Sequence, residues 1–207
     1  MGIDYSVNLY YKKHQIEDAI LGVISIADFI DEESTEVELP DGKKLKIPFE
    51  TIPKKDFVKI APDQKFANFC TLLNFPIDSP IVKYVENNNA RKEKGLASIG
   101  CIYLDIKVGE IYTEFSFTAA TSNMSRLFLE SKSIQQTFIN LLEKTEGLFG
   151  LFDIEESYYL SLFDLNKQVG NCGKKTVKNE YDSTDYNIDT FTEICLLHKD
   201  CCLQQDF

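Results

Sequence analysis

The C-terminal part of the chain holds the side chains best suited to binding a metal. Thiolates and imidazoles are the usual ligands of tetrahedral zinc sites. The residues of this kind are Cys172, Cys195, His198, Cys201 and Cys202. Zinc hairpins normally offer two ligand pairs on separate turns, whereas here one cysteine stands alone and the spacing C-x2-H-x2-C is not that of a standard finger. We therefore predict no metal and no other cofactor, and zinc bound by this set is the alternative.

A second set of polar residues lies where a predicted strand meets a predicted helix. Hydroxyls, free backbone amides and a guanidinium can converge on a carboxylate or phosphate at such a junction. The residues are Thr121, Ser122, Asn123, Ser125 and Arg126. Ser, Thr and Asn also dominate helix starts, because their side chains satisfy the unpaired amides of the first turn. Capping is favoured here, and an anion site in a small-ligand-binding protein or an enzyme is the alternative.

The chain is acidic, with 33 Asp and Glu against 22 Lys and Arg and a formal net charge of −11. The imbalance is large over residues 14–50, which hold ten acids and three lysines. Such a charge repels phosphate backbones and anionic lipid surfaces and attracts basic partners. We therefore predict a binding or regulatory protein that engages a basic protein partner, as immunity-type inhibitors and adaptors do, and neither nucleic acid nor a membrane. The candidate contact residues are Asp31, Glu32, Glu33, Glu36 and Glu38.

Residues suited to nucleophilic catalysis are sparse. A nucleophile needs a base nearby, and the chain contains two histidines, His14 and His198. Cys70 and Cys101 lie in apolar, strand-like surroundings, where thiols are usually structural and inert. The chain also lacks the Gly-rich phosphate-binding loop, the nucleophile elbow and the H-E-x-x-H zinc motif. These observations favour a role other than catalysis, and no catalytic residue is predicted.

Two hydrophobic periodicities predict an α+β fold, a largely antiparallel sheet with helices on one face. Apolar and polar residues alternate in the predicted strand and hairpins, at 5–12, 37–49, 102–119 and 148–163. Helical spacing predicts helices at 15–30 and 133–146 and a short one beginning at Ser79-Pro80. The segment 66–75 suits a strand or a helix, and we prefer a strand.

The order of these elements indicates how the chain is organised. Strand, helix and hairpin follow one another at residues 5–49 and again at 111–163, which suggests two βαββ units. Residues 1–165 are predicted to form an α+β domain, with the polar run 86–95 as a candidate internal boundary. Hydrophobic patterning then collapses, so 166–207 is predicted to be an irregular tail with one short docked helix. The sequence has no signal-peptide pattern and no apolar run long enough to span a bilayer, which predicts a cytoplasmic protein.

Overall fold

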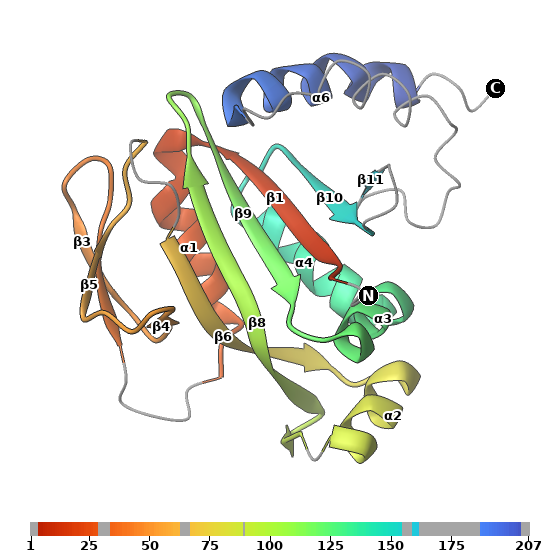
Figure 1. Ribbon diagram of the computed structural model, residues 1–207. Coiled ribbons are helices and arrows are strands. Elements are labelled where there is room, and N and C mark those ends of the chain that lie inside the picture. The colour runs from red at the N-terminus through yellow and green to blue at the C-terminus, as the bar shows by residue number, and fades with distance from the viewer. Residues whose placement is uncertain are drawn as a thin grey trace.

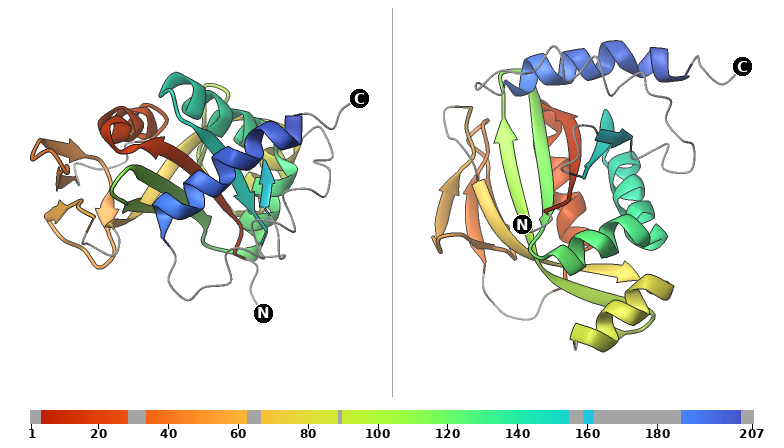
Figure 2. Two further views of the ribbon diagram at one scale, coloured as in Figure 1. Left: turned by 90° about the horizontal axis from the view of Figure 1, so that it is seen from above. Right: turned by 45° about the vertical axis from the view of Figure 1, so that its right-hand side comes forward.

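The structure is a computed structural model that describes residues 4–28, 34–62, 67–88, 90–154, 159–161 and 187–203. Its centre is a large twisted sheet with helices packed against one face (Figures 1 and 2). A further helix, α6 (Ile188–Leu203), lies across the opposite face near one end of the strands (Figure 2). A small three-stranded sheet stands beside this body.

The large sheet is built from antiparallel neighbours around the N-terminal strand. β1 (Ser6–Lys12) pairs with β9 (Tyr112–Ala119) on one side and with β10 (Phe149–Asp153) on the other. Across the whole sheet the strands follow in the order β11 (Tyr159–Ser161), β10, β1, β9, β8 (Leu96–Val108), β6 (Ala67–Pro76) and β4 (Glu50–Thr51). The short strand β7 (Lys92–Glu93) also pairs with β8.

The small sheet contains the predicted hairpin with the Pro-Asp-Gly turn. β2 (Thr35–Glu38) pairs antiparallel with β3 (Lys44–Ile47) and parallel with β5 (Phe57–Lys59). Gly42 in the turn has φ +86°, a conformation that glycine adopts without a steric penalty. The Asp41 carboxylate accepts a hydrogen bond from the Lys43 N–H at 3.0 Å, which closes the turn.

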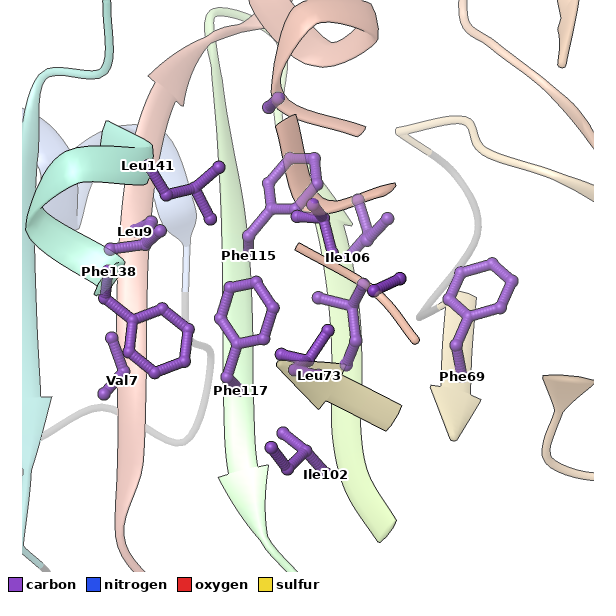
Figure 3. Close-up of a cluster of buried hydrophobic side chains, with 14 of the residues drawn as sticks. Val7, Leu9, Phe69, Leu73, Ile102, Ile106, Phe115, Phe117, Phe138 and Leu141 are labelled. Atoms are coloured by element: carbon purple, nitrogen blue, oxygen red, sulfur yellow. The ribbon is translucent and has the colours of Figure 1, made fainter. Parts of the chain in front are cut away.

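Apolar side chains on the helical face of the large sheet form the core (Figure 3). The helices on this face are η1 (Lys13–Gln15), α1 (Ile16–Ser25), α3 (Ser122–Glu130) and α4 (Lys132–Lys144), and α2 (Ser79–Asn88) follows β6. Val7 and Leu9 of β1 point toward α4, because alternate residues of a strand share a face. The Phe138 ring of α4 is fully buried, and its centroid lies 4.9 Å from that of Phe117 and 5.9 Å from that of Phe75. These aromatic contacts fasten α4 to the sheet.

The predicted α+β fold with a largely antiparallel sheet is confirmed, and so is the choice of strand over helix for β6. The helix predicted over 15–30 ends early, at Ser25. The chain pairs with β6 just beyond this point: Ala27 forms a bridge with Leu73, and the Asp28 N–H donates to the Leu72 carbonyl at 2.9 Å. Tertiary pairing with a neighbouring strand has overridden the helical pattern.

The order of strand, helix and hairpin recurs as expected, but the two hairpins do not occupy equivalent places. The β2–β3 hairpin belongs to the small sheet, whereas β10 and β11 extend the large one. The two units therefore share an element order without sharing a position in the sheet.

The polar run 86–95 and the helix of the tail both contain more secondary structure than their composition indicates. Residues 86–95 contain the end of α2 and the short strand β7, and the strands on either side, β6 and β8, pair directly with each other. In the tail, α6 is 16 residues long. Apart from Asn187, the rest of the tail lies outside the described residues.

Candidate functional site

The predicted anion junction forms the N-terminus of α3. The Thr121 hydroxyl accepts a hydrogen bond from the Met124 N–H at 3.2 Å and so caps the helix. Ser125 is fully buried; its hydroxyl donates to the Thr121 carbonyl and accepts from the Tyr5 N–H at 3.1 Å.

The Thr121 hydroxyl therefore caps α3, as the favoured interpretation expects, and the Ser125 hydroxyl connects α3 to the residue before β1. Ser122 is half-buried, while Asn123 and Arg126 are exposed. The hydrogen bonds of Thr121 and Ser125 show capping, and ligand binding at this junction stays a prediction.

The predicted acidic contact residues fall into two groups. Asp31, Glu32 and Glu33 lie outside the described residues. Glu36 and Glu38 lie on β2, where Glu36 forms an ion pair with Lys44 at 2.8 Å and Glu38 one with Lys59 at 3.1 Å. Exposed pairs of this kind contribute about 0–1 kcal/mol, so a partner could exchange with them at little cost.

The candidate zinc ligands are described only in part. Cys172 and the side chains of His198, Cys201 and Cys202 lie outside the described residues, and no cluster of three or more potential metal ligands occurs within the described part of the chain. Cys195 is half-buried against the sheet, and burial raises the pKa of its thiol to about 12. A thiol in this state is protonated near neutral pH, and zinc would have to displace its proton on binding.

Sequence reasoning missed the contacts that hold α6 on the sheet. The Asp189 carboxylate accepts hydrogen bonds from three backbone N–H groups of the β8–β9 turn, those of Glu110 at 2.7 Å, Ile111 at 3.1 Å and Tyr112 at 2.9 Å. The Tyr112 hydroxyl donates to Glu193 at 2.6 Å. Glu193 raises the pKa of Tyr112 to about 12, first through this hydrogen bond, and burial and nearby negative charge act in the same direction.

An aromatic cluster completes the attachment of α6. Phe191 is buried, with its ring centroid 5.7 Å from that of Tyr10, and the Tyr10 ring stacks on Phe149 at 4.6 Å. Gly109 permits the close approach, since a Cβ there would lie 2.6 Å from the Ile188 side chain. The hairpin at 102–119 was predicted, but nothing in the sequence of its turn indicates that a residue nearly 80 positions away uses the turn amides.

A hollow with a polar rim lies on the helical side, between the start of α1 and the end of α4. We call it the α1–α4 hollow, and its volume is about 460 Å³. It is lined by His14, Gln15, Asp18, Leu21, Gly22, Lys144, Thr145 and Glu146.

Two contacts fix the walls of the α1–α4 hollow. Gln15 receives the Lys12 N–H at its side-chain oxygen and donates through its amide to the Glu146 carbonyl, both at 2.9 Å. At Gly22 the helices approach so closely that a Cβ would lie 2.5 Å from the Thr145 methyl group. Any larger residue at position 22 would force the side chains of Thr145 and Leu141 to shift.

The electrostatics of the α1–α4 hollow favour a cation. Asp18 and Glu146 are exposed, and neither carboxylate forms an ion pair with another described residue. The hollow lies at the C-terminal end of α4 and at the N-terminal end of α1, whose dipoles place opposite partial charges there, so the preference for a cation rests on the carboxylates of Asp18 and Glu146. Lys144, a cation at the rim, donates to the Ser25 hydroxyl at 3.3 Å. Leu21, 47% exposed, adds an apolar patch to the lining.

No family model, curated protein or solved structure matches the chain. Within the described residues, no helix combines the length and apolar character needed to cross a membrane.

Proposed function

We propose that this protein is an acidic binding or regulatory protein that engages a basic protein partner, and that the α1–α4 hollow receives a Lys or Arg side chain of that partner. The observation that carries the proposal is the pair of carboxylates, Asp18 and Glu146, at the rim of a hollow of about 460 Å³. The net charge of −11 supports the same class of partner.

The lining of the α1–α4 hollow matches the two parts of a basic side chain. The aliphatic stem of Lys or Arg packs on apolar surface while its charged end stays near water, and exposed Leu21 offers such a surface. The charged end would then lie between the carboxylates of Asp18 and Glu146, beside the C-terminal carbonyls of α4. A phosphate or carboxylate would meet repulsion at the same place.

The charge of the whole chain would act before contact. Long-range attraction between an acidic protein and a basic one raises the association rate and weakens as salt screens it. The acidic run Asp31-Glu32-Glu33 would add to this attraction, whereas Glu36 and Glu38, each paired with a lysine, would act only on contact by exchanging that lysine for a basic side chain of the partner. Immunity-type inhibitors and adaptors bind their partners in this manner.

The test compares two double variants that change the net charge equally. Asp18→Asn with Glu146→Gln removes both carboxylates of the hollow, and Glu86→Gln with Glu130→Gln removes two exposed carboxylates of α2 and α3. Each immobilised protein is incubated with native lysate at low salt, and bound proteins are eluted with salt and identified.

We expect the wild type and the Glu86/Glu130 variant to retain the same basic protein and to release it at high salt. The Asp18/Glu146 variant should bind that protein, once purified, roughly 5- to 30-fold more weakly, since each exposed charge contact contributes about 0.5–1 kcal/mol. Equal binding by both double variants would remove the hollow from the proposal. The absence of any salt-sensitive basic partner would refute the function itself.

A further inference from the structure

Two cysteines far apart in sequence meet on neighbouring strands. Cys70 lies in β6 and Cys101 in β8, and the pairs Cys70 with Tyr103 and Thr71 with Ile102 set the register between these strands. Cys101 is the diagonal neighbour of Cys70 across this ladder, close enough for its thiol and backbone N–H to affect the pKa of Cys70. Both cysteines are free.

An irregularity in the β6–β8 ladder creates this meeting. Thr71 pairs with Ile102 but Leu73 pairs with Ile99, so one residue of β6 faces two residues of β8, Gly100 and Cys101. This is a β-bulge, a feature that redirects side chains and occurs often beside functional sites.

The bulge decides which way Cys101 points. Ile99 and Ile102 are both fully buried, although residues three apart in a regular strand face opposite sides. Because of the extra residue, the Ile102 side chain faces the core, and Cys101 is exposed on the face that also holds Cys70.

The backbone at Cys101 is in an unfavourable conformation. Its φ is +58°, in the left-handed region that costs a residue with a Cβ roughly 1–2 kcal/mol. Glycine would avoid this cost, and the chain has glycine one position earlier, at residue 100. Unfavourable conformations that persist in a folded protein are concentrated at functional sites.

The two thiols differ in accessibility. Cys101 is exposed, whereas Cys70 is half-buried. Burial raises the pKa of Cys70, and the neighbouring Cys101 thiol raises it further. An oxidant in solution would therefore reach Cys101 first, with Cys70 held beside it as a protonated thiol.

We propose that Cys70 and Cys101 form a redox-active dithiol that a hydroperoxide converts into a disulfide between β6 and β8. In the first step the Cys101 thiolate attacks the peroxide; an S–O bond forms, the O–O bond breaks, and water or an alcohol leaves. This gives a sulfenic acid on Cys101. The Cys70 thiol then attacks that sulfur, an S–S bond forms, the S–O bond breaks, and the hydroxide leaves as water with the Cys70 proton.

The electrons and protons of these two steps balance without a further reagent. Two thiols lose two electrons and two protons, and the peroxide bond is reduced by the same two electrons. The sequence alone favoured inert, structural thiols at both positions, because it shows neither the contact between them nor the exposure of Cys101. This inference is independent of the proposed function.

The test uses the full reduced chain, freed of reductant and treated with hydrogen peroxide. Free thiols are then alkylated, and the protein is cleaved after Lys and Arg without reduction. Cys70 and Cys101 fall in the separate peptides 66–83 and 95–107. We expect these peptides to appear joined, with the loss of two hydrogen atoms, and to separate on reduction.

Variants test the order of the two steps. Cys70→Ser should leave Cys101 as a sulfenic acid that a dimedone probe traps, and the wild type should give little of this adduct. Cys195→Ser is the matched control and should form the link as the wild type does, because its half-buried thiol lies in α6 and not in β6 or β8. Phenylarsine oxide, which bridges two adjacent thiols with release of water, should bind the reduced wild type and block the link.

Two results would overturn the proposal, and neither depends on a variant that folds poorly. One is wild-type Cys101 oxidised to sulfenic or sulfinic acid with no joined peptide. The other is a disulfide from Cys70 or Cys101 to some other cysteine in place of the joined pair.

Discussion

The Asp189 carboxylate holds α6 on the sheet, and the effect of its removal on the docking of this helix can be calculated. We consider Asp189→Ala, which deletes the acceptor of three backbone N–H groups in the β8–β9 turn. The matched control is Glu110→Gln, because the exposed Glu110 carboxylate is in the same turn but forms no hydrogen bond or ion pair with another described residue. Both variants remove one negative charge from the same region.

The expected loss of docking free energy follows from how exposed these hydrogen bonds are to water. A hydrogen bond to a charged group contributes about 1.5–3 kcal/mol when it is well shielded. Water can replace the acceptor at the exposed Glu110 and Ile111 amides, whereas the Tyr112 amide is partly buried. We therefore expect a loss of about 2 kcal/mol in the docking of α6, which corresponds to roughly a 30-fold rise in its opening equilibrium. Phe191, packed against Tyr10, should keep the helix bound most of the time.

Native-state hydrogen exchange of individual amides measures this opening directly. Exchange should accelerate roughly 30-fold in α6 of Asp189→Ala and stay unchanged in α4, where the Phe138 contacts are intact. Glu110→Gln should exchange as the wild type does. Unchanged exchange in α6 of Asp189→Ala, or equal acceleration in Glu110→Gln, would refute the view that this carboxylate anchors the helix.

Two further predictions concern pH. Burial alone would raise the pKa of Asp78, but hydrogen bonds from the Ser133 and Ile81 N–H groups and neighbouring hydroxyls lower it below 3.8, so its contribution is present above that pH and lost as pH falls. Urea denaturation should show Asp78→Asn less stable than the wild type by about 1–2 kcal/mol at neutral pH, with the difference shrinking in acid. Burial raises the pKa of Tyr11 from 10.0 to about 12 despite its hydrogen bond with Thr145, so stability should fall as pH rises from 10 to 12. Tyr11→Phe should lose less stability over that alkaline interval, and equal losses would contradict this explanation.

Much of the secondary structure follows from local pattern. The apolar–polar alternation at 5–12 and 37–49 and the helical spacing at 133–146 each predicted the element that forms, because strand and helix periodicities depend on near neighbours. The capping reading of Thr121 also agrees with the structure, since an N-cap bonds to an amide three residues away.

The candidate sites were less accessible to such reasoning. The hollow between α1 and α4 joins Asp18 to Glu146, and the dithiol joins Cys70 to Cys101, across separations that no spacing rule covers. The bulge that exposes Cys101 is a mismatch between two strands, so it has no counterpart in either strand alone.

The amino-acid sequence by itself determined the fold class, most of the strands and helices, and the negative charge, because these depend on composition and on residues a few positions apart. Only the tertiary structure decided that α1 ends just before the chain pairs with Leu73 and that the β2–β3 hairpin joins a separate sheet. It also decided that the Asp189 carboxylate accepts hydrogen bonds from the amides of the β8–β9 turn. Each of these depends on which distant backbone amides and apolar faces remain available once the neighbouring elements have packed.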